Sequence, residues 1–400
     1  MLEQMLLDPT TGKAPMLAIT NGQLITISHG TIPGGTVLID KGRFLAVGSG
    51  LRVPRGTRIL DAAGCHVYPG LVDAHGHHGV YAEMSGPEGA DGNEMTDPIT
   101  PHVRALDSLN WFDPGFDDAV SNGVTTVNVL PGSANVIGGQ GIVVKTWGRE
   151  PGARILREPS GLKMALGENP KRVYGGKKKT PATRLGNAAL MREAFAKARN
   201  YQRLRAQGKA DRDLRWEILG DVLDGKFPAR CHAHRADDIL TAIRISREFG
   251  FPLTIEHCTE GHRVAEQLAE AGVMCTLGPL LTGKSKQELN NRSLEAAPAL
   301  ERAGVIFGFT TDHPVIPTYS LPLCAAYAVG AGMSREGALR ALTLDAARVV
   351  GLEHRLGSLT AGKDADCFIA DGDLLDPRSR VLTTLVDGHV AWQLEDGPRI

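Results

Sequence analysis

The sequence predicts an α/β fold, with a parallel sheet or barrel in the middle of the chain and a small β domain built from its two ends. Three observations support this prediction. The chain has 400 residues, about two to three times the usual length of one domain. Its middle part alternates short apolar strands with longer amphipathic helices, and β-branched runs bounded by turn signals occur near the two ends. A hydrophobic fraction of 42% is that of an ordinary globular protein and excludes a disordered or fibrous chain.

The two ends of the chain have the pattern of small antiparallel strands. Short β-branched runs share this pattern: 24–27, 37–39, 44–47, 366–370 and 381–392. Asp387-Gly388 adds a tight-turn signal near the carboxyl terminus. We therefore predict that residues 1–66 and 356–400 fold together as one small β domain.

The middle of the chain, residues 67–355, is predicted to form the barrel. Eight short apolar segments are candidate strands: 68–74, 124–130, 142–147, 162–166, 229–234, 253–257, 273–277 and 305–311. After the fifth of them, Ile239 and Ile243 recur at helical spacing, and a long basic helix is expected over 184–205. A further helix is expected over 262–271. In an eight-stranded α/β barrel the reactive residues lie at the carboxyl ends of the strands.

Charge and composition limit the partners and the compartment. With 44 Lys+Arg against 45 Asp+Glu, the chain has no broad basic surface for nucleic acid or for an anionic membrane. No window approaches the roughly 18 apolar residues of a membrane span, and residues 1–13 lack the regions of a secretory signal. The six cysteines have no CxxC pair or disulfide-type spacing. We therefore expect a cytoplasmic protein that acts on a small molecule, without nucleic acid or membrane, and homo-oligomerisation stays open.

Histidine pairs at strand ends point to a metal site. His75 and His77 end the first candidate strand, and residues two apart on a strand point the same way, so both imidazoles can face one ion. Metal-type side chains also end three other strands: His232 with His234, His257, and Asp312. Such donors suit zinc, iron, manganese or nickel. We expect one or two divalent transition-metal ions per chain, with zinc as the first choice.

A family resemblance follows from these motifs taken together. Residues 69–77, the later His234, His257 and Asp312, and the closing segment 357–366 resemble the amidohydrolase superfamily, and within it the imidazolonepropionase-related amidohydrolases. The resemblance covers essentially the whole chain. It implies a (β/α)8 TIM-type barrel flanked by a small β-sandwich domain formed from the N- and C-terminal segments. It also implies metal ligands at a fixed set of positions: His75, His77, His257 and Asp312.

Two further ligand positions need a choice. On the fifth strand we prefer His234 to His232, because His234 lies closer to the carboxyl end and Asp237 follows three positions later, as in many family members. The family often adds a bridging carboxylate, a glutamate or a carboxylated lysine, at the end of the third or fourth strand. Glu168 lies at the carboxyl end of strand 162–166 and is preferred on that ground, while Lys163 and Lys145 stay open. If none of them binds metal, the site holds one ion.

The resemblance implies a hydrolase that cleaves a C–N bond of a small molecule by metal-activated hydroxide. The bond lies in a cyclic amide, an N-acyl amino acid or a dipeptide-like amide rather than in an ordinary peptide. Asp312 is expected to accept the proton and deliver it to the leaving nitrogen. His257 or His262 is expected to stabilise the oxyanion. The candidate substrate contacts lie beside the ligands: His78, Arg235, Asp237 and His313.

Two other functions are weighed against this one. The alternative is an aminohydrolase, that is, a deaminase of a heterocycle, which uses the same metal centre. Its usual cue, a glutamate three residues after the fifth-strand histidine, is replaced here by Asp237. A non-catalytic scaffold on the same fold is expected to lack metal ligands, and all the expected ligand types are present.

Overall fold

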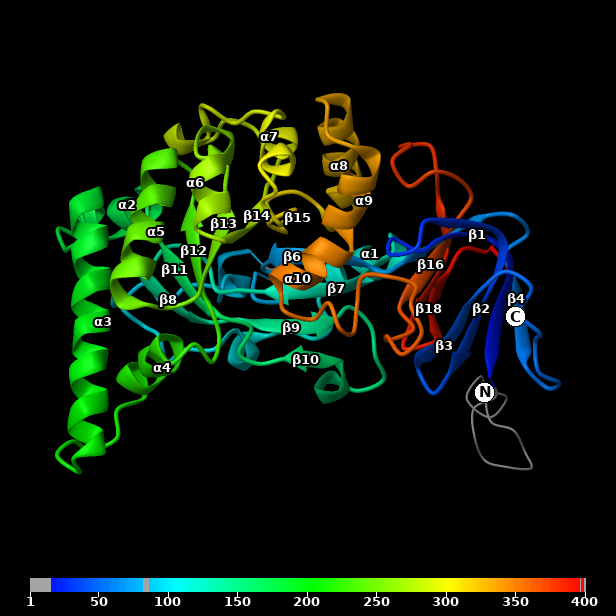
Figure 1. The fold of residues 1–400 in the computed structure, drawn as a ribbon. Coiled ribbons are helices and arrows are strands. Elements are labelled where there is room, and N and C mark those ends of the chain that lie inside the picture. The colour runs from blue at the N-terminus through cyan, green and yellow to red at the C-terminus, as the bar shows by residue number, and fades with distance from the viewer. Residues whose placement is uncertain (1–15, 82–85, 396, 399–400) are drawn as a thin grey trace.

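The protein is described by a computed structural model of residues 16–81, 86–395 and 397–398 (Figure 1). The segment 1–13, on which the expectation about a secretory signal rests, lies outside the described residues. Figure 1 shows a β-rich part, with strands from the first and the last described segments of the chain, beside a larger part in which helices surround further strands. Within the described residues no helix has the length and apolar character needed to cross a membrane.

Strands from both ends of the chain lie in one eight-stranded sheet. They are β1 (Leu17–Ile25), β2 (Thr31–Asp40), β3 (Arg43–Gly48), β4 (Arg58–Asp61), β5 (His66–Pro69), β16 (Cys367–Ala370), β17 (Val381–Val386) and β18 (His389–Gln393). The strand order is β18-β17-β16-β5-β1-β2-β3, with β4 beside β1. The antiparallel pairing of β5 with β16 joins the two ends. Apolar side chains from both ends, among them Leu24, Phe44, Ile369 and Leu385, are buried in one cluster.

The predicted strand 68–74 is two strands, one in each part of the molecule. β5 ends at Pro69 in the terminal sheet, and β6 (Leu71–Gly76) pairs in parallel with β7 (Val124–Val129). Gly70 lies between them, where an added Cβ would come within 2.0 Å of Thr125 Oγ1. The prediction was wrong here because an apolar run shows where strands form but not where the chain passes from one sheet to another.

Two more sheets form the larger part of the molecule. Besides β6 and β7 they contain β8 (Ile137–Gln140), β9 (Ile142–Lys145), β10 (Ile155–Arg157), β11 (Leu162–Ala165), β12 (Ala229–Ala233), β13 (Leu253–His257), β14 (Met274–Leu277) and β15 (Phe307–Phe309). Their orders are β10-β9-β7-β6 and β15-β14-β13-β12-β11-β8. Strands β11 to β15 are mutually parallel. After β15, the Thr311 hydroxyl donates to the Asp73 carboxylate of β6, so the two sheets meet at these strands.

The third predicted strand, 142–147, does not join the sheet in parallel. It is β9, and it runs antiparallel to β7. Only residues 130–141 separate the two strands, and they contain glycines and β8 but no helix in the described structure. A parallel crossover usually contains a helix, and this connection of twelve residues has none, so the chain returns antiparallel to β7.

The helices cover the outside of these sheets. They are α1 (Pro114–Ser121), α2 (Glu168–Gly176), α3 (Arg184–Ala206), α4 (Leu214–Leu223), α5 (Ala236–Phe249), α6 (Ala265–Glu270), α7 (Ala296–Arg302), α8 (Leu321–Gly330), α9 (Arg335–Leu342) and α10 (Leu344–Val349). The predicted helix 184–205 is confirmed as α3, and α5 buries Ile239 and Ile243 as expected. The predicted helix 262–271 is shorter, because Val264 has non-helical dihedral angles and separates a 3-10 turn from α6.

Candidate metal centre

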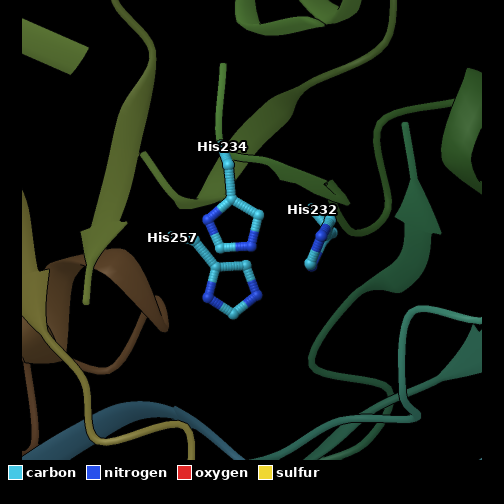
Figure 2. A group of neighbouring side chains, drawn as sticks. All are labelled: His232, His234 and His257. Carbon is cyan, nitrogen blue, oxygen red and sulfur yellow. The ribbon is translucent and has the colours of Figure 1, made fainter. Parts of the chain in front are cut away.

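Two groups of metal-type side chains lie at the carboxyl ends of the parallel strands. One group contains His75, His77 and Asp312, and the other contains His232, His234 and His257. Within each group, one donor atom from each residue lies within 4.8 Å of the others. Figure 2 shows the second group, with the three imidazole rings gathered around one small space. The structure therefore brings together the histidines and the aspartate that the sequence placed at strand ends.

In the first group, Asp312 joins the two histidines of β6. Its Oδ1 atom lies 3.3 Å from Nε2 of His75 and 3.2 Å from Nε2 of His77. The other ring nitrogen of each histidine is engaged outward: Nδ1 of His75 donates to Glu256 at 2.7 Å, and Nδ1 of His77 donates to the Leu130 carbonyl at 2.7 Å. These bonds place the proton on Nδ1 and leave both Nε2 lone pairs available for a metal ion.

The second group is prepared in a similar way. Nδ1 of His257 donates to the Gly278 carbonyl at 3.0 Å, and Nδ1 of His234 bonds the Thr259 hydroxyl at 2.7 Å. Nε2 of His234 and Nδ1 of His232 are buried without a hydrogen-bond partner in the described structure. Burial lowers the pKa of His232 to about 4 and holds the pKa of His234 and His257 well below the usual value, so the rings are neutral. Neutral, buried and unpaired imidazole nitrogens fit a metal ion.

The two groups border one space. The rings of His75 and His257 are 4.6 Å apart between centroids, and Asp312 Oδ2 lies 4.0 Å from Nδ1 of His257. His257 and Asp312 both have positive backbone φ angles, 74° and 53°. Such angles are costly for these residues and are concentrated at functional sites. The backbone is thus held in an unusual conformation where the two groups meet.

Lys163 lies at the site, whereas Glu168 lies in neither group. The Lys163 amine is buried, 3.3 Å from Nε2 of His75. Glu168 begins α2, and its Oε2 accepts the backbone N–H of Glu288. The strand position favoured Glu168, but the flexible four-carbon stem of a lysine carries its amine well beyond its backbone. Lys145, the other open alternative, binds aspartates 364, 366 and 387 beside the terminal sheet.

The candidate substrate contacts fall into two environments. His78 and His313 are fully buried and stack at 4.1 Å, and Nε2 of His78 bonds the Thr318 hydroxyl. Arg235 and Asp237 form an ion pair at 2.8 Å, with side chains 39% and 51% exposed. Arg235 and Asp237 are therefore accessible to a substrate, whereas His78 and His313 are packed behind the ligands. His262 lies in the 3-10 turn that precedes α6.

The strand-end pattern misses two residues that support His75. Glu256 accepts a hydrogen bond from His75 on one oxygen, and its other oxygen lies 3.0 Å from Nε of Arg230. All three side chains are fully buried. Burial raises the pKa of Glu256, but Arg230 and His75 outweigh it and bring the pKa to about 2. The sequence shows only that Glu256 directly precedes His257 and that Arg230 lies two residues before His232. Neither position indicates a contact with His75.

An α/β protein with histidine and carboxylate groups at its strand ends is the class that the fold and the site define. The amidohydrolase family model matches residues 153–391. The chain belongs to the amidohydrolase family. The resemblance stated from the motifs is confirmed at this level.

Named relatives and a solved structure agree with this assignment. The crystal structure of an amidohydrolase from Thermotoga maritima is 43% identical, with a TM-score of 0.91, and the match covers 94% of this chain and 100% of that one. Amidohydrolase tasK of Hapsidospora irregularis is 32% identical over 88% of this chain and 39% of its own length. Imidazolonepropionase of Symbiobacterium thermophilum is 26% identical over 88% of this chain and 90% of its own length.

Deaminases are also among the relatives. An adenine deaminase of Listeria monocytogenes is 26% identical over 89% of this chain and 54% of its own length. The chain thus spans 39% of the length of tasK and 54% of the length of this deaminase.

Proposed function

We propose that the protein is a metal-dependent hydrolase that cleaves a C–N bond in a small cyclic amide, N-acyl amino acid or dipeptide-like amide. The observation that carries the proposal is the pair of donor groups that border one buried space at the strand ends. Family membership supports it, because hydrolases that act on C–N bonds are named among the relatives.

The metal in this proposal is zinc, and the site takes two ions. One is held by His75, His77 and Asp312, and the other by the histidine group. Lys163, carboxylated at Nζ by carbon dioxide with release of a proton, supplies the bridging carboxylate. Burial lowers the pKa of the Lys163 amine to about 8, which raises the fraction of neutral amine available for that reaction. Glu168 is the less favoured bridge, because its carboxylate is directed to the Glu288 backbone.

The proposed chemistry assigns a task to each nearby side chain. A bound divalent ion supplies an acidified water and a polarised carbonyl. Asp312 takes a proton from the attacking water and passes it to the leaving nitrogen, as a carboxylate between the two groups can do. Glu256 keeps the proton of His75 on Nδ1. His257 borders both groups, but its Nδ1 proton is donated to the Gly278 carbonyl, so it would hold an ion through Nε2 and has no N–H left for the oxyanion.

Other parts of the proposal concern the fold and the cell. The parallel strands β6, β7 and β11 to β15, and the contact from Thr311 to Asp73, support a (β/α)8 TIM-type barrel. The division into a terminal β-sandwich domain and a barrel that ends at 355 belongs to the same proposal, with the first boundary moved from 67 to Gly70, because β5 lies in the terminal sheet. The proposal also includes a cytoplasmic location, a small-molecule substrate rather than nucleic acid or a membrane, and homo-oligomer formation.

A deaminase of a heterocycle is the second candidate. The adenine deaminase match over 89% of the chain favours it. The two reactions differ in their products, because deamination releases ammonia from every substrate, whereas hydrolysis of a cyclic amide or a substituted amide does not.

The metal content of purified protein tests the central claim. We expect about two equivalents of a transition metal by elemental analysis, and at least the equivalent held by His75, His77 and Asp312 is lost in His75→Ala combined with His77→Ala. Metal retained in full by the folded double variant contradicts the assignment. A panel of amides and aminated heterocycles, assayed for ammonia and for amide loss, separates the two reactions.

A further inference from the structure

A second buried glutamate contacts the histidine group from a different loop. Glu288 lies in the 3-10 turn Gln287–Leu289, in the loop that follows β14. Its side chain is fully buried, and its Oε1 atom is 3.4 Å from Nε2 of His232 and 3.5 Å from Nε2 of His234. The loop therefore brings a carboxylate to the strand ends of β12, although the two segments are more than fifty residues apart in sequence.

The two carboxylate oxygens of Glu288 have different neighbours: Oε2 is bound by a backbone N–H, and Oε1 points toward the histidines. The backbone N–H of Glu168 donates to Oε2 at 3.1 Å, and Oε2 lies against Gly167. Gly167 has a φ angle of 85°, and an added Cβ would lie 2.6 Å from that oxygen. A residue with a side chain is strained by the backbone angle at this position, and its Cβ would displace the Glu288 carboxylate. The site is thus shaped to hold this carboxylate, with Oε1 left for other partners.

Nε2 of His232 makes a long hydrogen bond to Oε1 at 3.4 Å, whereas Nε2 of His234, at 3.5 Å from Oε1, has no hydrogen-bond partner in the described structure. The distance from Oε1 to His234 therefore suits two ligands of one metal ion better than a hydrogen bond. A good N–H···O bond has a heavy-atom distance of about 2.9 Å. Ligand bonds of about 2.0–2.2 Å in a tetrahedral zinc site place neighbouring donor atoms about 3.4 Å apart. Nδ1 of His234 is already bonded to Thr259, so Nε2 is the nitrogen that faces both the metal space and Glu288.

Charge supports the same conclusion. The histidine group consists of neutral rings, and a divalent ion in a buried site needs nearby anions. Asp312 lies on the side of His75 and His77. Glu288 is on the side of His232 and His234, where the Lys286 amine now lies 2.8 Å from Oε1. Lys286 is a partly exposed lysine, 20% accessible at its side chain, so its charge can move to solvent when a cation replaces it.

We propose that Glu288 is a further ligand of the metal centre: its Oε1 binds the cation of the histidine group beside His234. This assignment rests on the proposed function, since it needs a metal at that group. It adds a donor from the loop after β14 to the ligand set that the strand-end motifs imply. In this assignment the Lys286 amine competes with the metal ion for Oε1 of Glu288.

Metal titration of the purified protein tests this assignment. Metal-free protein is titrated with Zn²⁺, and with Co²⁺ followed by visible absorption, in wild type and in Glu288→Gln. We expect one of two equivalents to bind at least about tenfold more weakly in Glu288→Gln, with a changed cobalt spectrum, because even an outer-shell partner is worth about 10- to 100-fold in affinity. Lys286→Met is expected to bind that equivalent more tightly.

Glu260→Gln is the matched control. Glu260 is also a buried loop carboxylate, but its oxygens accept from the Ala236 backbone and the Asn291 side chain. We expect both metal affinities to be unchanged in this variant. If Glu288→Gln does not fold, Glu288→Asp keeps the charge, withdraws the oxygen by one methylene, and is expected to weaken the same equivalent.

The outcomes separate this inference from the proposed function. Two equivalents with wild-type affinity and an unchanged cobalt spectrum in folded Glu288→Gln or Glu288→Asp overturn the role of Glu288 and leave the proposed metal centre standing. Equal weakening in Glu260→Gln also overturns it, because the effect then reflects loop packing. Wild-type protein that binds no metal overturns the proposed function itself.

Discussion

Two buried lysines on neighbouring parts of the fold show how the surroundings decide what one residue type does. Lys145 of β9 and Lys163 of β11 are each 1% exposed. Lys145 lies among three carboxylates, at 3.1 Å from Asp364, at 3.0 Å from Asp366 and in contact with Asp387. Burial alone lowers the pKa of an amine, but these aspartates raise the pKa of Lys145 above its usual value.

Lys163 has a different environment. Its nearest polar contact is Nε2 of His75, and burial lowers its pKa to about 8, with Glu256 and Asp312 offsetting only part of the effect. Lys145 stays charged, and its ion pairs connect β9 to the segments that flank β16 and β17 of the terminal sheet. A lysine with a depressed pKa and no carboxylate in direct contact among the described residues is suited to chemistry. The same side chain thus serves the fold in one region and, in our proposal, the metal centre in the other.

The largest expected effect lies in the metal centre. In Asp312→Asn the side chain retains an oxygen but can no longer accept a proton, so kcat should fall by about 10²- to 10⁴-fold while most of the metal stays bound. Steady-state kinetics and elemental analysis on the same sample check both parts. Near-normal turnover would remove Asp312 as the proton carrier.

Lys145→Met tests the junction with the terminal sheet. The substitution leaves three aspartates without their buried cation, and removing one partner of a buried ion pair costs about 3–5 kcal/mol. We expect the free energy of unfolding to fall by that amount in denaturant titration, with metal content per folded molecule unchanged. Loss of metal without loss of stability would contradict the structural role of Lys145.

Lys163→Met should give the reverse result. We expect metal affinity to fall by at least about 10- to 100-fold at one equivalent. Stability should change little, because no carboxylate of the described residues contacts the buried amine directly and Met keeps most of its apolar stem. Metal titration beside denaturant titration measures both. An unchanged second equivalent would return Glu168 to consideration, and Glu168→Gln titrated in parallel provides that comparison.

The smallest effect is expected at the accessible ion pair. Arg235→Ala removes a pair with Asp237 whose side chains are 39% and 51% exposed, so stability should change by less than about 1 kcal/mol. If Arg235 contacts substrate, KM rises with kcat nearly constant. An unchanged KM across good substrates would exclude Arg235 from the binding site.

Local patterns were sufficient for much of the site and the fold. Spacing of two residues on a strand placed His75 with His77, and His232 with His234, and the ends of β13 and β15 supplied His257 and Asp312. Helical periodicity located α3 and α5. These features depend on residues close in sequence, whose geometry is fixed by the repeat of the strand or helix.

Other features depend on contacts between distant segments, and the sequence does not determine them. The antiparallel return of β9 and the division of strand 68–74 follow from which sheet each segment joins. The choice between Lys163 and Glu168, the support of His75 by Glu256 and Arg230, and the approach of Glu288 all depend on side chains that meet across strands and loops.

By itself, then, the sequence determined the residue types of a metal centre and the strand ends that carry them. The reason is that residues two apart on a strand point to the same side, so the spacing of the histidines shows that they can face one ion. Only the tertiary structure decided which lysine is paired with carboxylates and which faces the histidines. The reason is physical: the charge state and role of a buried amine depend on its burial and on the charges within a few ångströms, and those neighbours come from β13, β15 and the terminal sheet rather than from its own segment.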